Sequence, residues 1–262
     1  MDFQESFLYG FSGYLIVACL MLAMTITYVV GSRFSHSTKI DISDNKFGPI
    51  ESSILALLAL LLSFTFGQSA QRFEVRRQAL VEEANSIEAV IRKSNLYPDE
   101  ERKAMRDDLR QYVEIRIAFY DAGVDKQKVV QTLEDARSIQ ARLWDRVTRL
   151  GQSRDNLIPT NNMVPSLTSM TDSMTKRSSA GLSTVPDSVM WMLFALCVLS
   201  SFTVGFAPGE NKPWWLGVGV FILAISMAVF LIIDMDRPRQ GTISLDSPQR
   251  NIINLRQLLQ DN

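Results

Sequence analysis

The sequence contains few of the residues that build metal sites and disulfides. In 262 residues it has one histidine, His36, and two cysteines, Cys19 and Cys197. One histidine without clustered cysteines cannot supply the nitrogen and sulfur ligands of a zinc site. Both cysteines lie in apolar stretches, where a lone thiol behaves as a small hydrophobe. We therefore expect no metal, no disulfide and no cofactor.

An excess of charge of one sign is also missing. The 27 Lys and Arg residues are balanced by 28 Asp and Glu residues, for a net charge of -1. Nucleic acid is therefore not an expected partner, because no bulk positive field would attract it. The sequence contains no nucleophile elbow and no glycine-rich phosphate loop, and a single histidine gives no basis for a catalytic triad. We do not expect an enzyme.

Charge is absent altogether from four long stretches of the chain. Asp, Glu, Lys and Arg do not occur within residues 6–32, 52–71, 188–209 and 213–233. Each stretch is long enough to cross a hydrocarbon core of roughly 30 Å as a helix rising about 1.5 Å per residue. The residues before the first stretch are acidic, which is unlike a secretory signal peptide. The sequence predicts an all-α integral membrane protein with four transmembrane helices.

The distribution of basic residues predicts the orientation in the membrane. Four spans place both termini and the long middle segment on one side. Basic residues near the membrane are more frequent on that side, so the positive-inside rule places it in the cytoplasm. We divide the chain into transmembrane helices 1 and 2 (1–71), a cytoplasmic helical region (72–187), transmembrane helices 3 and 4 (188–235) and a cytoplasmic C-terminal tail (236–262).

The middle segment has the pattern of long amphipathic helices. Its first apolar residues recur at spacings of three, four and seven, as in a coiled-coil seam that continues the second span out of the bilayer. They are Phe73, Leu80, Ala84, Ile87 and Ile91. Pro98 and the three acidic residues after it predict the start of a new helix, which the glycine at 123 interrupts. The inner face of this second helix consists of Met105, Leu109, Tyr112, Arg116 and Phe119.

A third helix is predicted over residues 126–150, with Gly151 as its C-terminal cap. Its apolar stripe consists of Val129, Leu133, Ala136, Leu143, Val147 and Leu150. Residues 152–164 contain proline and several asparagines, and we expect a loop there. Residues 166–180 are then a last short helix before the third span.

The second charge-free stretch differs from the others because small and polar residues follow one of its faces. The column consists of Ser52, Ala56, Ala59, Ser63, Gly67 and Ala70. One interpretation is close helix packing of the small-xxx-small kind. The other is a pore-lining face, where small and hydroxyl side chains leave room for water and ions. Four helices enclose little space, so a pore requires several copies of the chain around an axis.

Charged residues flank this second stretch. Glu51 precedes it, and Arg72, Arg76 and Arg77 follow it. They can anchor the helix at the membrane interface. If the helix lines a pore, the same charges lie at its mouths and influence which ions enter, and the pair Arg76 and Arg77 favours anions.

Three motifs resemble those of a known family. They are SFTFGQSAQRFEVRRQALVEEANSIEAV at 63–90, TSMTDSMTKRSSAGLSTVPDSVMWML at 168–193 and IIDMDRPRQG at 232–241. Together they are similar to the prokaryotic bestrophin-like membrane proteins, and more distantly to bestrophins. The resemblance implies a homo-oligomer, a pentamer by analogy, in a prokaryotic plasma membrane, in contact with lipid and inorganic ions. It also implies anion conduction along the second helix of each subunit.

The resemblance assigns positions along that helix. An ungapped comparison places Ala56, Leu60 and Phe64 at the three hydrophobic neck positions of a bestrophin pore. Phe64 keeps the aromatic pattern, Leu60 is smaller, and Ala56 departs from it. Asp236, Pro238 and Gly241 keep the outline of the segment after the last bestrophin helix. The acidic cluster of the animal calcium clasp is absent, so calcium gating is not implied.

The leading hypothesis is therefore a passive ion channel, with anions favoured, narrowed near Leu60 and Phe64. The alternative is a non-conducting, membrane-anchored scaffold or sensor whose cytoplasmic helices bind a partner. A coupled transporter is a third class, but no span contains the buried charge or the paired helix breaks of a coupled site.

Overall fold

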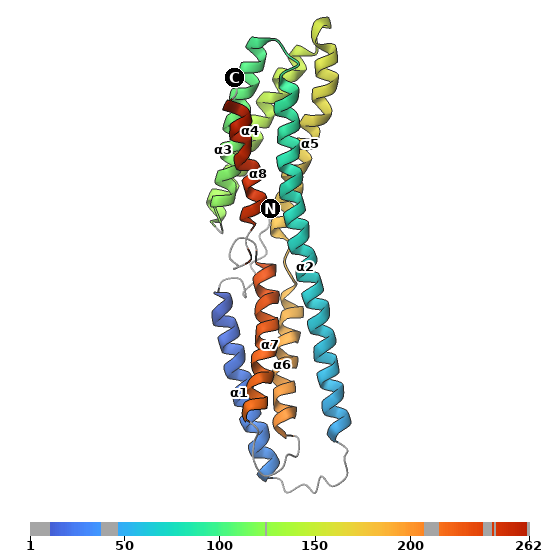
Figure 1. Ribbon diagram of the computed structural model, residues 1–262, viewed down its shortest axis with the longest axis vertical. Coiled ribbons are helices and arrows are strands. Elements are labelled where there is room, and N and C mark those ends of the chain that lie inside the picture. The colour runs from blue at the N-terminus through green and yellow to red at the C-terminus, as the bar shows by residue number, and fades with distance from the viewer. Residues whose placement is uncertain are drawn as a thin grey trace. The chain divides into compact units, whose positions relative to one another are not determined.

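The computed structural model describes residues 11–37, 47–123, 125–206, 215–237, 243 and 245–260, and these residues form helices without strands (Figure 1). The predicted all-α class is confirmed. The helices are α1 (Gly13–Ser37), α2 (Phe47–Ser94), α3 (Asp99–Asp121), α4 (Lys126–Leu150), the 3-10 turn η2 (Arg154–Asn156), α5 (Leu157–Leu182), α6 (Asp187–Phe206), α7 (Trp215–Asp236) and α8 (Asp246–Gln260).

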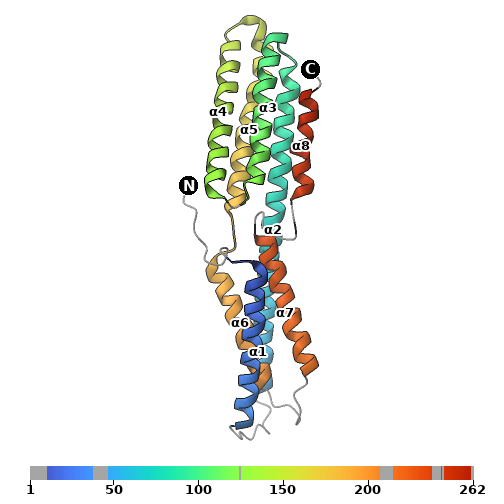
Figure 2. The same cartoon turned by 90° about the vertical axis from the view of Figure 1, so that its left-hand side faces the viewer.

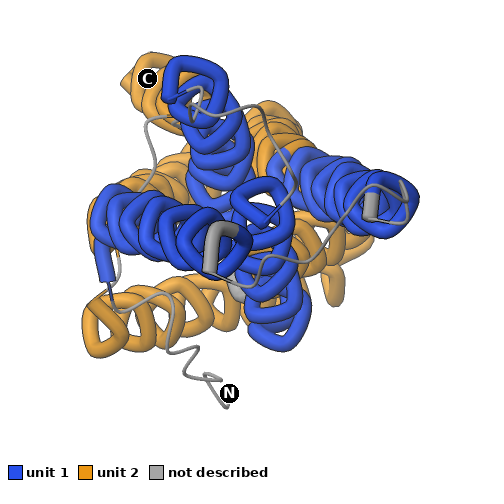
Figure 3. Tube along the Cα trace, turned by 90° about the horizontal axis from the view of Figure 1, so that it is seen from below, with its two compact units in different colours: residues 1–73, 184–237 blue, residues 74–183, 238–262 orange. Residues whose placement is uncertain are grey.

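The chain divides into two compact units, coloured separately in Figure 3. Unit 1 comprises residues 1–73 and 184–237, and unit 2 comprises residues 74–183 and 238–262. Helix α2 contributes to both units because it runs unbroken for 48 residues. The predicted continuation of the second span as one helix is therefore confirmed.

Unit 1 contains the apolar helices. Four helices are long and apolar enough to cross a membrane: α1, α2, α6 and α7. Helix α1 packs against both α6 and α7, and the three lie together in Figure 2. Their contact is formed by Met24 of α1, Leu193 and Cys197 of α6, and Val229 of α7, all fully buried. These helices support the prediction of a membrane protein.

Helices α1 and α6 approach one another closely through two glycines. A Cβ atom added to Gly31 would lie 2.4 Å from the carbonyl oxygen of Phe202, and one added to Gly205 would lie 2.3 Å from that of Tyr28. Neither position has room for a methyl group. Nearby, the Ser201 hydroxyl donates a 2.7 Å hydrogen bond to the Met24 carbonyl. This crossing is of the small-residue kind common in membranes.

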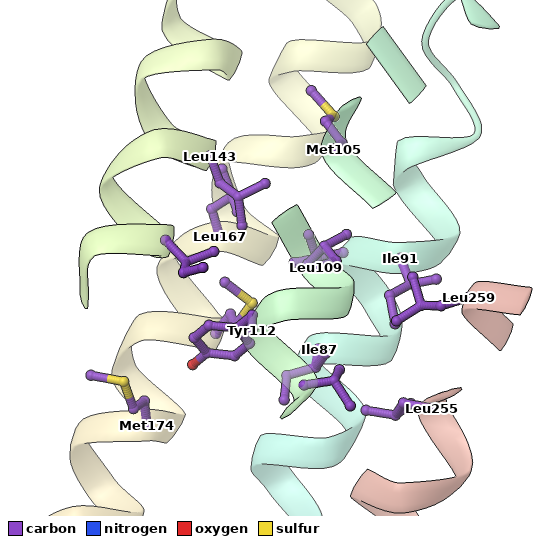
Figure 4. Packing of buried hydrophobic residues seen from close by; sticks show 14 of the residues in the cluster. Ile87, Ile91, Met105, Leu109, Tyr112, Leu143, Leu167, Met174, Leu255 and Leu259 are labelled. Carbon is purple, nitrogen blue, oxygen red and sulfur yellow. The ribbon is translucent and has the colours of Figure 1, made fainter. Parts of the chain in front are cut away.

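Unit 2 is a helical bundle with one apolar core (Figure 4). The seam predicted for α2 is buried at Leu80, Ala84, Ile87 and Ile91, as is the predicted inner face of α3. Helix α3 packs between α4 and α8, as Figure 2 also shows. Helix α3 follows Pro98, and Gly123 just after its end has a φ of 56°, so both predicted boundaries are confirmed.

The predicted loop at 152–164 is wrong. Helix α5 begins at Leu157 and continues through Pro165, which lies inside it. A proline there loses one backbone hydrogen bond and costs about 3 kcal/mol. A buried stripe along the same helix offsets this cost, since each buried apolar side chain contributes roughly 1.5–3 kcal/mol. The stripe consists of Met163, Leu167, Met170 and Met174.

The C-terminal segment contains a packed helix that the sequence interpretation treated only as a tail. Helix α8 buries Ile252, Leu255 and Leu259 in the core of unit 2. The guanidinium of Arg256 donates two hydrogen bonds, of 2.7 and 2.6 Å, to the carboxylate of Glu114 on α3. Helix α8 is therefore part of the bundle.

Candidate functional site: the exposed face of α2

One face of α2 packs against the rest of unit 1. Leu58, Thr65 and Ser69 are buried there, at spacings of seven and four that place them on one side of the helix. The Thr65 hydroxyl donates a 2.8 Å hydrogen bond to the carbonyl of Leu61 on the preceding turn. Such a bond satisfies a hydroxyl inside an apolar environment.

The neck residues lie on the opposite side of the helix. Phe64 is 61% exposed and Leu60 is 53% exposed, and Ala56 is also exposed. Spacings of four place the three residues in a row, and at 3.6 residues per turn this row faces away from Leu58 and Thr65. A large aromatic side chain on an apolar helix is therefore left uncovered by the described part of the chain.

The column of small residues is also uncovered. Ser52, Ala59, Ser63 and Gly67 are exposed, and Ala70 is half-buried. A Cβ atom added to Gly67 would meet nothing within 4 Å. The column therefore makes no close helix contact within the described chain. Both interpretations, a pore face and close packing against a second copy, remain consistent with it.

Burial separates α2 from the other apolar helices. In its most apolar 18-residue window only 11% of the residues are buried, against 50% in the corresponding window of α6. Helix α2 is the least apolar of the four helices and is also the one covered least by the described chain. Most of its surface is thus available to lipid, to further copies of the chain or to a pore.

The charged residues predicted at the pore mouths differ in their surroundings. Glu51 is half-buried. In unit 1, Nη1 of Arg72 lies 3.7 Å from Oδ1 of the buried Asp236, whose Oδ2 accepts a 2.9 Å hydrogen bond from the Val185 amide. This carboxylate, at the end of α7, therefore contacts both α2 and the backbone two residues before α6. Pro238 and Gly241, which completed the predicted motif with Asp236, lie outside the described residues.

The other two arginines belong to unit 2. Arg76 is buried, and its Nη1 donates a 3.2 Å hydrogen bond to the Ser183 carbonyl. Arg77 is exposed and binds both carboxylate oxygens of Glu74, at 2.7 and 2.6 Å. Both guanidinium groups are thus engaged within the unit, and the carboxylate of Glu74 reduces the charge that Arg77 presents to an ion.

Comparison with known proteins gives the family. The sequence model of the Bestrophin-like domain matches residues 15–248, which is most of the chain. The chain belongs to the Bestrophin-like family. No curated protein matches it.

The fold of this bestrophin-like chain is shared with solved structures of a bacterial bestrophin homologue from Klebsiella pneumoniae. One variant of that protein is 16% identical, with 96% of this chain and 99% of that chain covered and a TM-score of 0.69. A second variant is 16% identical over 94% and 99% of the two chains, with a TM-score of 0.65. A third variant is 15% identical, with 94% of this chain and 98% of that chain covered and a TM-score of 0.63. At these identities the likeness shows the fold.

Two features of the bestrophin-like chain were missed by sequence reasoning. One is the contact of Arg72 with Asp236, whose only signal was a carboxylate three residues after an apolar stretch. The other is a buried ionic cluster in unit 2, formed by Glu83, Arg116 and Arg177. Its signal was an arginine at an inner-face position of α3. Within the described residues, no group of three His, Cys, Asp or Glu side chains is placed to hold a metal ion.

Proposed function

We propose that this bestrophin-like protein is a passive ion channel, in which several copies of the chain surround a pore lined by α2. The observation that supports this most is the exposed row of Ala56, Leu60 and Phe64, on the side of α2 that its own chain leaves uncovered. We further propose that the transmembrane helices in residues 1–71 and 188–235 cross a prokaryotic plasma membrane, and that residues 72–187, residues 236–262 and both termini are cytoplasmic.

Polar side chains on the same side of α2 favour a pore over lipid as the environment. Ser63, Gln68 and Gln71 are all exposed. An amide or hydroxyl without a partner costs several kcal/mol in hydrocarbon, whereas water in a pore hydrates it. A ring of copies provides such a pore, since one chain encloses too little space. The resemblance to bestrophins suggests five copies.

Phe64 and Leu60 are the proposed constriction. In a ring, their side chains from each copy would converge and form a hydrophobic collar, and such collars control conduction by excluding water. Ala56 provides no such bulk, so the collar is two residues deep. The proposed preference for anions rests on the likeness to bestrophin anion channels, because Arg76 and Arg77 are engaged with neighbours.

Currents across planar bilayers test this function. Purified, assembled protein is expected to give currents that depend on salt, and Phe64→Ala and Leu60→Ala are expected to enlarge them. Phe66→Ala is the matched control, because Phe66 is also an exposed phenylalanine of α2 but points away from the Phe64 row. Silent bilayers from an assembled, folded protein would refute the proposal, as would equal effects of Phe64→Ala and Phe66→Ala.

One observation favours the alternative, a non-conducting, membrane-anchored scaffold. The uncovered column at Ser63 and Gly67 would allow α2 helices of two copies to approach closely. Images of the detergent-solubilised particle separate the two functions. A ring with α2 nearest the axis supports the channel, and a dimer joined through the Gly67 column supports the scaffold.

A further inference from the structure

The core of unit 2 contains three charged side chains that water does not reach. Glu83 of α2 and Arg116 of α3 are both 0% exposed, and Arg177 of α5 is 7% exposed. Nε of Arg116 donates a 2.5 Å hydrogen bond to Oε1 of Glu83. Nη1 of Arg177 donates to Oε2 of the same carboxylate. One carboxylate thus serves two guanidinium groups.

The charges in this cluster do not cancel. An arginine remains charged inside a protein, so one carboxylate and two guanidinium groups leave a net charge of +1. Neutral groups of the described chain also lie against the cluster: the ring of Phe119, the hydroxyl of Tyr112 and the amide of Gln249. Burial lowers the pKa of Arg177, although the carboxylate of Glu83 opposes this. An uncompensated buried charge is strongly unfavourable.

Several buried donors in the cluster also lack acceptors. Within the described chain, Nη1 and Nη2 of Arg116 make no hydrogen bond, and neither does Nε2 of Gln249. The ring of Phe119, 4.3 Å from Cζ of Arg116, covers the flat face of that guanidinium. The ring does not accept from the N–H groups in the guanidinium plane. The orientation of the Gln249 amide is fixed, since its oxygen accepts a 3.3 Å hydrogen bond from Arg177.

We propose that a small monovalent anion, of the chloride or nitrate class, binds at the Nη1 and Nη2 edge of Arg116. One negative charge neutralises the +1 cluster, and an acceptor at this edge receives the two unpartnered donors of Arg116. The anion must be small, because every group around the site is buried. A water molecule would accept the hydrogen bonds but would leave the charge uncompensated. The site lies in unit 2, and it is independent of the proposed channel function.

The melting temperature of the full-length protein in detergent tests this site. At equal ionic strength, chloride and nitrate are expected to raise the melting temperature along a saturable curve relative to gluconate, since a ligand that binds only the folded state stabilises it. Phosphate, which is larger and mostly divalent, is expected to give no saturable increase in melting temperature, because it stabilises folded proteins only by exclusion from their surface. A melting temperature of the wild type that is equal in chloride and gluconate would overturn the proposal.

Variants assign any response to the cluster. Arg116→Gln leaves a neutral Glu83–Arg177 pair and is expected to lose the chloride response. Arg256→Gln removes an exposed guanidinium from the same unit and is expected to keep it, because Arg256 binds Glu114 at the surface. Equal chloride responses in these two variants would overturn the proposal, since the effect would then be a general one of salt.

Glu83→Gln keeps the test decisive if Arg116→Gln fails to fold. This variant retains both guanidinium groups and removes the charge that repels the anion. The half-saturating chloride concentration is expected to fall by about tenfold or more. An unchanged or higher half-saturating concentration would overturn the proposal. In crystals grown with bromide, an anomalous peak is expected beside Nη1 and Nη2 of Arg116, and a peak-free site would contradict it.

Discussion

Replacing Gly205 with alanine is expected to push α1 and α6 apart. The new Cβ atom would lie 2.3 Å from the carbonyl oxygen of Tyr28, 3.0 Å from its carbonyl carbon and 3.1 Å from its Cα. All three atoms belong to the backbone, so no side chain can rotate away. Ordinary van der Waals contact begins near 3.4 Å. The two helices must therefore separate locally by about 1 Å.

Separating α1 from α6 destabilises the folded chain. Overpacking of a tightly packed contact typically costs about 1–3 kcal/mol. The same shift stretches the 2.7 Å hydrogen bond from Ser201 to the Met24 carbonyl, and such bonds in membranes contribute about 0.6 kcal/mol on average. Since alanine favours helix by up to about 1 kcal/mol, we expect Gly205→Ala to lower the free energy of unfolding by about 1–3 kcal/mol in total. Reversible unfolding in mixed micelles, followed by tryptophan fluorescence, measures this loss.

Two other glycines in membrane helices serve as controls. A Cβ atom at Gly219 of α7 or at Gly67 of α2 would meet nothing within 4 Å. Alanine at either position is expected to leave the folding of the chain unchanged or to stabilise it by up to about 1 kcal/mol, because alanine favours helix. If Gly205→Ala is as stable as Gly219→Ala, the backbone contact of α1 with α6 does not exist as described.

Two further predictions concern unit 2. Leu143→Ala removes a fully buried side chain from the core and is expected to lower the free energy of unfolding, measured with a chemical denaturant, by about 2–5 kcal/mol. Trp144→Ala, at an exposed neighbouring position, is expected to change it by less than about 1 kcal/mol. Equal losses in the two variants would contradict the assigned core. The Arg256 guanidinium holds the pKa of the Glu114 carboxyl below its usual value. The pair therefore stabilises α8 fully at pH values above about 4.3, the pKa of Glu in the unfolded chain, and this stabilisation is lost as the pH falls through the lower pKa of the folded state. Hydrogen-exchange rates of α8 are expected to differ between the wild type and Glu114→Gln at neutral pH and to become equal in acid. A difference that does not change with pH would contradict this prediction.

The membrane helices and most of unit 2 could be predicted because composition alone dictates them. A stretch without charge must be buried in lipid or protein, and the seam from Leu80 to Ile91 has the helical period. The path through Pro165 and the packing of α8 could not be predicted this way. Both depend on apolar side chains, such as Met163 and Leu255, whose partners lie on helices distant in the sequence.

The candidate sites show the same division. The row of Leu60 and Phe64 was identified from spacing and resemblance, but what covers it depends on groups outside one chain. The ionic cluster was visible only as Arg116 on an inner face. Its carboxylate partner, Glu83, lies 33 residues before it, and Arg177 lies 94 residues after Glu83. No local pattern connects residues at such distances.

Accessibility of introduced cysteines to water tests the central proposal most directly. In a protein whose own Cys19 and Cys197 are replaced, Leu60→Cys and Phe64→Cys are expected to react with a charged, water-soluble thiol reagent added to conducting bilayers, and the current is expected to fall as they react. Phe66→Cys is expected to be unaffected. The account would be contradicted if the reagent left the current of Leu60→Cys and Phe64→Cys unchanged. It would also be contradicted if only the current of Phe66→Cys responded.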